Sequence, residues 1–328
     1  MTLRCAVLGG GVMGILHAQV YASLPDVELV AIVEPDPTRH ELLGRLPCRV
    51  LRDPAQLGDV DAVSACLPDH VRLSALRPFL ERGTPLLIEK PFATSVTECR
   101  TMMDLAGPDQ IMVGQILRFD PRVAALRATV REGELGNLQA GRIWRCSSTA
   151  TASRIAGRTS VAWFLGIHDV DLVRYVTGQR IAAVRAIGHS VLSRTYDVVR
   201  GELVLQNGAA IGFDWSWIWP SSFPAGMTAG LEVVASDGAV TCDLGHDSVH
   251  VIDERSGRHR TPDVFHWPMG HAGAPIGDIR EEIAGFVGAV RSRRPAPVTA
   301  SDATESVAVI EAVHRSCEDE GALTDVEL

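Results

Sequence analysis

The chain has 328 residues, a formal net charge of −9 and a hydrophobic fraction of 46%. Its negative charge argues against nucleic acid or an anionic membrane as the main partner. No apolar run reaches the ~20 residues that a membrane-spanning helix needs. The seven cysteines are scattered and form no C-x-x-C pair, which predicts reduced thiols, no zinc site and a cytoplasmic protein. The length predicts two domains.

A glycine-rich turn follows the first expected strand, residues 4–8, and opens a helix. Its spacing is G-x-G-x-x-G, the pattern of a dinucleotide-binding turn. The first glycine permits a tight turn, the second lets a diphosphate approach the backbone, and the third lets the helix pack on the strand. The start of the helix offers backbone N–H groups to phosphates. The expected cofactor contacts in this turn are Gly9, Gly11, Val12, Met13 and Gly14.

An acidic residue, Glu34, ends the second expected strand, residues 28–33, and lies 20 residues after Gly14. A carboxylate at this place accepts hydrogen bonds from ribose hydroxyls and repels a 2′-phosphate, so the sequence favours NAD over NADP. Arg39 lies close enough in sequence to keep NADP as an alternative. The structural alternative for Glu34 is an ordinary polar strand end.

Strands and helices continue to alternate up to residue 120. Further strands are expected at 62–67, 85–88 and 111–115, with helices at 71–82 and 96–106. This alternation predicts an N-terminal Rossmann domain with a doubly wound parallel sheet, in an α/β protein. Because ligands bind at the carboxyl ends of such strands, Pro68 and Lys90 are expected on the same side as the glycine turn.

Lys90 is the single lysine among 31 basic residues. Arginine remains charged under ordinary conditions, whereas a buried lysine can accept and return a proton near neutral pH. Lys90 follows an apolar run and Glu89, and it precedes Pro91, which cannot continue a strand ladder. These neighbours favour a reactive ammonium at a strand end over a stray surface lysine.

The second half of the chain changes character and becomes rich in alternating, tryptophan-containing segments. After a helix at 121–131, strands are expected at 141–148, 183–191, 198–205, 209–217, 231–235, 239–243 and 248–252. The turn pairs Asn207-Gly208 and Asp237-Gly238 predict hairpins. Two helices, at 277–291 and 301–320, follow. The pattern predicts a C-terminal α+β domain with a large, mostly antiparallel open sheet.

The domain boundary is therefore expected near residue 120. Residues 1–120 form the dinucleotide-binding domain, and residues 121–328 form a domain for substrate binding and oligomerisation. One arrangement left open by the sequence has the last helix, about 301–320, packing back on the first domain.

A helix expected at 163–175 has an apolar stripe interrupted by His168. Asp171 is three residues further and lies on nearly the same face. One interpretation is a histidine satisfied within the core. Another is a metal site formed by His168, Asp169 and Asp171, although their spacing on a helix is geometrically poor for coordination.

Three motifs resemble those of the glucose–fructose oxidoreductase, inositol dehydrogenase and rhizopine catabolism (Gfo/Idh/MocA) family. They are the glycine turn with His17 three residues after Gly14, Leu67-Pro68-Asp69-His70, and Glu89-Lys90-Pro91. The resemblance implies that Pro68 borders the nicotinamide, that Glu89 and Lys90 face the nicotinamide and substrate, and that His70 opens the helix beneath. The cofactor contacts that it implies are Leu67, Pro68, His70, Glu89 and Lys90.

The resemblance also gives His168 a role. Family members carry a Gly-x-His-Asp-x-Asp-Leu helix whose histidine lies beside the substrate hydroxyl, near the lysine. This chain departs from the family pattern twice. Asp69 stands where Asn is more common, and Phe164 stands where dehydrogenases commonly place an aspartate four residues before the histidine. Asp171 is the first candidate to replace that aspartate.

The expected function is an NAD(P)-dependent dehydrogenase that acts on a secondary alcohol of a sugar, aminosugar or cyclitol. Lys90 and His168 would handle the substrate oxygen and its proton. The expected substrate contacts are Lys90, Trp163, His168 and Asp171. The resemblance implies a homodimer or homotetramer formed through the C-terminal sheet. Two alternatives are a non-catalytic NAD(P)- and ligand-sensing module, and a glycoside hydrolase or epimerase that retains NAD.

Overall fold

A computed structural model describes residues 2–107, 109–155, 157–222, 227–244, 248–253, 258–260 and 275–328. Its contacts divide the chain into two units. The first comprises the described residues of Met1–Phe119 and Trp267–Thr304, and the second those of Asp120–His266 and Glu305–Leu328. The expected second domain, 121–328, thus differs from the contact-based unit, because residues 275–304 group with the first. We propose that the cofactor domain includes this later segment.

The first unit contains a six-stranded parallel sheet with strand order β3-β2-β1-β4-β5-β6. The strands are β1 Leu3–Leu8, β2 Val27–Val33, β3 Arg49–Leu51, β4 Ala62–Ala65, β5 Leu86–Glu89 and β6 Ile111–Gly114. Most of their side chains are buried, as expected when helices cover both faces of a parallel sheet. The doubly wound prediction is confirmed, whereas the short strand β3 had no clear signal in the sequence.

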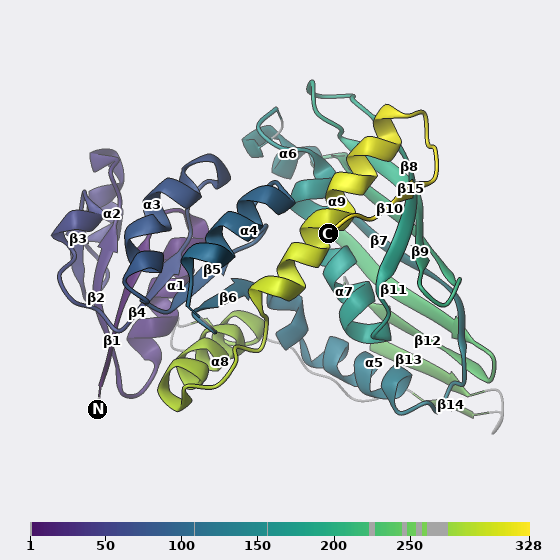
Figure 1. Ribbon diagram of the computed structural model, residues 1–328, viewed down its shortest axis with the longest axis horizontal. Coiled ribbons are helices and arrows are strands. Elements are labelled where there is room, and N and C mark those ends of the chain that lie inside the picture. The colour runs from purple at the N-terminus through teal and green to yellow at the C-terminus, as the bar shows by residue number, and fades with distance from the viewer. Residues whose placement is uncertain are drawn as a thin grey trace. The chain divides into compact units, whose positions relative to one another are not determined.

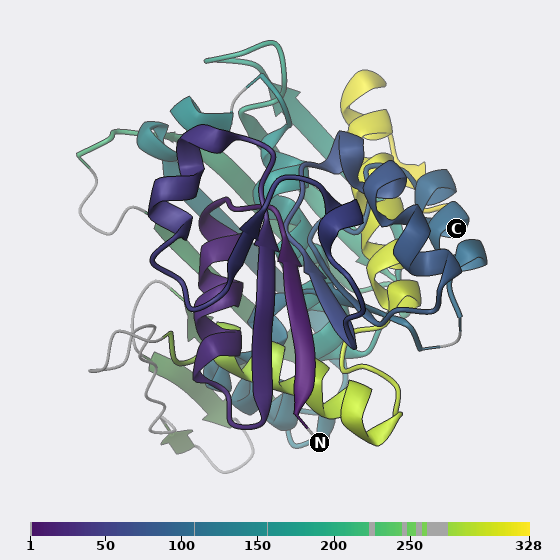
Figure 2. The same cartoon turned by 90° about the vertical axis from the view of Figure 1, so that its left-hand side faces the viewer.

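Helices cover this sheet. The longer ones are α1 Val12–Ser23, α3 Asp69–Glu81, α4 Val96–Leu105 and α8 Asp278–Ser292; the short ones are η1 Pro37–Arg39, α2 His40–Leu43, η2 Pro54–Gln56 and η3 Ile116–Phe119. Helix α3 packs against α4, and α1 packs against α8. In Figure 2, α1 lies on one side of the strands, and α3 and α4 lie on the other. The packing of α1 on α8 brings residues that are more than 250 positions apart in the sequence into one core.

The second unit is built on a sheet that has nine strands among the described residues, in the order β14-β13-β12-β11-β7-β10-β9-β8-β15. The pairs are antiparallel except for β7 and β10, which are parallel. The strands are β7 Leu138–Ser148, β8 Ile181–His189, β9 Val198–Leu205, β10 Ala210–Trp219, β11 Met227–Ala235, β12 Gly238–Asp243, β13 Ser248–Asp253, β14 Arg258–Arg260 and β15 Thr324–Asp325. The mostly antiparallel sheet is confirmed, and the two predicted turn pairs join β9 to β10 and β11 to β12.

The helices of the second unit are α5 Pro121–Arg131, α6 Thr149–Ile155, a π-helical segment Ala162–Gly166, α7 Ile167–Thr177 and the greater part of α9 Ala300–Glu318 (Figure 1). Helix α7 ends at Gly178, which adopts a φ of 69°. This left-handed conformation is the usual way to terminate a helix, and glycine adopts it without a Cβ penalty. Within the described part of the chain, we find no helix with the length and hydropathy needed to cross a bilayer.

Candidate functional site

The glycine turn between β1 and α1 has the shape that a diphosphate requires. Gly9 has a φ of +96°, and a Cβ on Gly14 would overlap the carbonyl oxygen of Gly9. By contrast, no described atom lies within 4 Å of the place where a Cβ on Gly11 would stand. No described side chain caps the start of α1, and its first turn contains no acidic residue. The turn therefore leaves its open side and the positive end of the helix to an anion.

Glu34 is tied directly to this turn. Its side chain is 7% exposed at the end of β2. One carboxylate oxygen accepts a hydrogen bond from the backbone N–H of Gly10 at 2.8 Å, and the other accepts one from Asp36 at 3.0 Å. Each oxygen can accept more than one hydrogen bond, so both retain capacity for ribose hydroxyls. Glu34 therefore stays a predicted contact for the adenosine side of NAD.

The ends of three neighbouring strands bring the other residues that were predicted to contact the cofactor to the same edge of the sheet. In the parallel register, Leu8 pairs with Ala65, and Ala65 pairs with Ile88. The residues that follow these strands are Gly9, the Leu67–Pro68 segment and the Glu89–Lys90 pair. Leu67 and Lys90 are half-buried, whereas Pro68 and His70 are exposed.

Arg72 on α3 connects two of these strand ends and was not among the predicted site residues. Its guanidinium is 2% exposed. One terminal nitrogen donates to the carbonyl oxygens of Pro91 and Phe92, and the other donates to the carbonyl oxygen of Leu67 at 2.9 Å. Asp69 balances the charge through an ion pair at 3.0 Å. The aspartate that departs from the family pattern thus has a partner one helical turn away.

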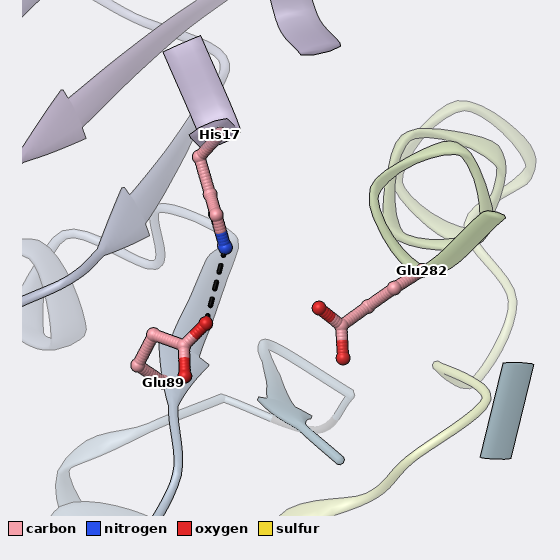
Figure 3. Close-up of side chains that lie close together, drawn as sticks. All are labelled: His17, Glu89 and Glu282. Carbon is pink, nitrogen blue, oxygen red and sulfur yellow. Dashed lines mark hydrogen bonds and ion pairs between the residues drawn. The ribbon is translucent and has the colours of Figure 1, made fainter. Parts of the chain in front are cut away.

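A buried hydrogen-bond network with side chains from α1 and β4 holds Glu89. His17 of α1 places Nε2 3.1 Å from a carboxylate oxygen of Glu89 (Figure 3). Its Nδ1 lies 3.1 Å from the hydroxyl of Ser64. The hydroxyl of Tyr21 lies 2.8 Å from the same Ser64 oxygen. The histidine of the family-like motif therefore positions the carboxylate that precedes Lys90.

The protonation state of Glu89 follows from its surroundings. Burial acts to raise the pKa of its carboxyl group. The hydrogen bond from His17, together with the charges of His17, Lys90 and Arg72, outweighs burial and lowers that pKa below its ordinary value. Glu89 is therefore ionised at neutral pH and places a negative charge beside the Lys90 ammonium.

His168 lies on α7, a helix of the second unit. Asp169, its neighbour on α7, is fully buried: Arg145 donates to one carboxylate oxygen at 2.7 Å, and the indole N–H of Trp215 donates to the other at 2.9 Å. Burial raises the pKa of Asp169, and Arg145 and Trp215 act in the opposite direction. These bonds hold α7 on the sheet, so Asp169 is a structural anchor and not a metal ligand. His168 is half-buried, and Asp171 is 1% exposed.

The π-helical segment before α7 presents two aromatic side chains. Trp163 stacks on His314 with ring centroids 5.7 Å apart and planes inclined by 20°, and Phe164 packs against Trp217 at 6.3 Å. The position at which family dehydrogenases commonly carry an aspartate is therefore part of an aromatic contact. Such single-turn π segments are frequent at functional sites.

Two family models match this chain. Residues 3–115 match an oxidoreductase family with an NAD-binding Rossmann fold, and residues 123–241 match the GFO/IDH/MocA C-terminal domain. The chain belongs to the Gfo/Idh/MocA family. The resemblance drawn from its motifs is thus confirmed, as is the prediction of an oxidoreductase that uses NAD. The residues of the glycine turn and Glu34 are the ones that would hold this cofactor.

Relatives of similar length share about a quarter of their residues with this Gfo/Idh/MocA member. The rhizopine catabolism protein MocA of Rhizobium meliloti is 24% identical over 94% of this chain and 93% of its own. Inositol 2-dehydrogenase of Rhizobium meliloti (strain 1021) is 26% identical, over 96% and 97%. An oxidoreductase from Agrobacterium radiobacter, solved with NAD+, L-tartaric acid and magnesium, superposes with a TM-score of 0.86 at 21% identity over 99% of both chains. This structural likeness confirms the fold.

Proposed function

We propose that this protein transfers a hydride between NAD and a secondary alcohol or ketone of a sugar, aminosugar or cyclitol. The observation that carries the proposal is the shared sheet edge in the first unit, where the glycine turn, Glu34 and Lys90 follow parallel strands. The names of the relatives support the substrate class, because they include an inositol 2-dehydrogenase and a rhizopine catabolism protein.

NAD, when bound, accepts the hydride from the alcohol carbon or returns it to the ketone. The protein must bind the substrate oxygen and move its proton. We assign the first task to the Lys90 ammonium, which polarises the oxygen, and the second to His168, which acts as general base in oxidation and as general acid in reduction. The two residues could exchange these roles. The ionised Glu89 supports the assignment of Lys90, since its negative charge attracts the ammonium.

Family dehydrogenases commonly have an aspartate four residues before the histidine, and such an aspartate can relay the substrate proton. In this chain another carboxylate must take that role. Phe164 occupies that position and contacts Trp217. Asp169 is held by Arg145 and Trp215, which leaves Asp171 as the carboxylate of α7 that we propose to assist His168. Trp163, one turn before His168, is our candidate for a wall of the substrate site.

The test is a screen of sugars, aminosugars and cyclitols with NAD and with NADP, followed by the absorbance of the reduced cofactor. We expect net reduction of NAD with at least one of these classes. The Lys90→Arg variant should keep NAD affinity within about threefold and lose turnover by a factor of about 10² or more. Near-normal turnover in this variant would refute the role of Lys90.

Two outcomes of the same screen would favour the alternatives. Product formation without net reduced cofactor, and with tightly held NAD, would indicate an epimerase or a glycoside hydrolase. Ligand binding without any turnover would indicate a sensing module.

We also propose a homo-oligomer formed through the sheet of the second unit. The large apolar side chains of Ile187 on β8 and Val234 on β11 are 57% and 45% exposed, which is consistent with a sheet face available to a second copy. Light scattering of the purified protein tests this proposal, and a monomer at micromolar concentration would contradict it.

A further inference from the structure

A second carboxylate lies behind the strand end that carries Lys90. Glu282 extends from α8 toward the pair formed by His17 and Glu89, as Figure 3 shows. One ligand-type atom of each of the three side chains lies within 4.8 Å of the others. Glu282 and His17 are 0% exposed, and Glu89 is 8% exposed. Burying an uncompensated charge is costly, so the charge state of each residue in this cluster has to be explained.

Hydrogen bonds link His17 and Glu89 to two further buried side chains. Nε2–H of His17 donates to the Glu89 carboxylate, Nδ1 of His17 shares a hydrogen bond with the Ser64 hydroxyl, and that hydroxyl shares another with the hydroxyl of Tyr21. Each of the four side chains from Tyr21 to Glu89 thus has a hydrogen-bond partner in this chain. Glu282 is outside the chain: neither of its carboxylate oxygens has a hydrogen-bond partner among the described residues.

An ionised Glu282 would be costly in this position. It would place a second buried negative charge within 4.8 Å of a carboxylate oxygen of Glu89. No described side chain donates a hydrogen bond that would compensate this charge. Burial raises the pKa of Glu282 well above its ordinary value, and the charges of Glu89 and Asp278 raise it further. Because Glu89 has a lowered pKa, the two carboxyl groups are driven toward opposite protonation states.

We propose that Glu282 is a neutral carboxylic acid at neutral pH that can donate a hydrogen bond to Glu89, directly or through one water, and that it is a positioning residue for the Glu89–Lys90 strand end. The gap within the cluster is at most 4.8 Å, which a side-chain rotation or one bridging water closes. A hydrogen bond from Glu282 would then join α8 to β5, as the His17 bond joins α1 to β5. The proposed protonation of Glu282 does not depend on the proposed function, whereas the positioning role rests on it.

A divalent cation is the competing occupant, because one imidazole and two carboxylates are a usable donor set. A cation would have to lose its hydration shell to enter a site in which two of the three side chains have no exposed surface. A proton neutralises the same carboxylate without that requirement. The observations therefore favour the proton, and cation binding is an outcome that the experiment must be able to detect.

The first experiment measures thermal unfolding of the wild type and of Glu282→Gln between pH 5 and pH 8. A raised folded-state pKa means that the wild type loses stability as pH rises above the ordinary glutamic acid value, ~4.3, because the unfolded state releases a proton that the folded state retains. The Gln variant cannot titrate there. The difference in Tm, variant minus wild type, should therefore increase by roughly 3 °C or more across this range.

Other groups around Glu282 are common to both proteins, so the difference isolates Glu282. Burial keeps Tyr21 and Cys66 neutral, because it raises their pKa values well above 10 and 9. The matched control is Glu281→Gln, an exposed neighbour on the same helix, whose Tm difference should not change with pH. The ionisable groups that face Glu282 are His17, Tyr21, Cys66, Glu89 and Asp278.

Three results would contradict the proposal that Glu282 is protonated at neutral pH. The first is a Tm difference that does not change with pH. The second is a rise in the Tm of the wild type, but not of Glu282→Gln, on adding Mg²⁺, Mn²⁺ or Zn²⁺. The third is failure of both Glu282→Gln and Glu282→Met to fold, since neutral side chains of similar size should replace a neutral acid. Infrared difference spectra between wild type and Glu282→Gln should contain the C=O band of a protonated carboxyl group.

The positioning role has a separate readout. Glu282→Ala should lower kcat by about tenfold with NAD affinity changed less than about threefold, and Glu282→Gln should restore most of the loss because an amide keeps one donor. Equal kcat values in the Ala and Gln variants would overturn it. If no substrate is turned over at all, the proposed function fails, while the comparison of Tm values still decides the protonation.

Discussion

A terminal nitrogen of Arg72 donates a hydrogen bond to the carbonyl oxygen of Pro91, the residue after Lys90. The other terminal nitrogen reaches Leu67, so one guanidinium holds the ends of β4 and β5 in register. An arginine at the carboxyl edge of a parallel sheet thus positions the backbone of the two strand ends, in addition to the effect of its charge on Glu89.

We expect Arg72→Lys to destabilise the protein by about 2–4 kcal/mol, because a single ammonium cannot reproduce bonds to both loops and is buried in their place. Turnover should fall by about tenfold, as Lys90 loses its fixed position. Thermal unfolding and kcat measure the two effects. Arg77→Lys, on the exposed face of the same helix, is the control and should change neither. Unchanged stability in Arg72→Lys would show that the hydrogen bonds from Arg72 are not needed to hold the ends of β4 and β5.

The glycine turn allows packing to be separated from cofactor binding. Gly14→Ala should cost about 1–3 kcal/mol, because its Cβ would overlap the Gly9 carbonyl oxygen. Gly11→Ala should leave Tm within about 1 °C, since its Cβ meets open space, yet weaken NAD binding by about tenfold or more because a methyl group obstructs the diphosphate. Calorimetric titration with NAD and thermal unfolding distinguish the two. Tight NAD binding by Gly11→Ala would place the diphosphate elsewhere.

Glu34 should set the choice between NAD and NADP. Removing its carboxylate in Glu34→Ala is expected to lower the ratio of kcat/KM for NAD over NADP by about tenfold or more, because the repulsion of a 2′-phosphate disappears. Tm must be followed as well, since the same carboxylate accepts a bond from Gly10. Arg39→Ala is the companion variant. If it abolishes wild-type activity with NADP, Arg39 binds the 2′-phosphate.

His314 should make the second unit sensitive to acid. Its Nδ1 lies 2.9 Å from the carbonyl oxygen of Ile310 and its Nε2 lies 2.8 Å from the Ser160 hydroxyl, an arrangement that suits a neutral ring with the proton on Nδ1. Burial lowers the pKa of His314. The folded state therefore resists protonation, and stability is lost as pH falls below the ordinary histidine value of ~6.5.

Replacing His314 by Gln should remove this acid sensitivity. Between pH 7.5 and pH 5, the wild type should lose about 2–4 °C more in Tm than His314→Gln does. His189→Gln, at an exposed position on β8, should behave as the wild type does. An identical loss in all three proteins would assign the acid sensitivity to other groups.

Much of the cofactor half could be predicted from the sequence, because its signals are local. The glycine spacing, the acidic end of β2 and the apolar strands each lie within a few residues. The same holds for the two hairpins, whose turn pairs Asn207-Gly208 and Asp237-Gly238 fix the antiparallel neighbours. Strands of three residues or fewer, such as β3 and β15, carry too little pattern to be recognised.

Long-range relations could not be predicted in this way. Glu282 meets His17 and Glu89 only because α8 packs on α1, and no local pattern states that pairing. A weaker signal did exist: Glu282 interrupts the stripe formed by Ile279, Ile283 and Phe286, as Arg72 interrupts that of Leu76, Phe79 and Leu80. A charge within an apolar stripe predicts a buried partner but does not identify it.

The anchoring of α7 has a consequence for how new specificities can arise. Asp169 attaches the helix to Arg145 and Trp215, while Gly166 lets the Trp215 ring approach so closely that a Cβ there would lie 2.6 Å from it. The helix is thus fixed by residues other than the predicted substrate contacts. Positions 163 and 164, in the π-helical segment before α7, can then mutate one at a time without displacing the helix that carries His168. Divergence among relatives, and laboratory evolution toward other alcohols, should concentrate at these positions and spare 166 and 169.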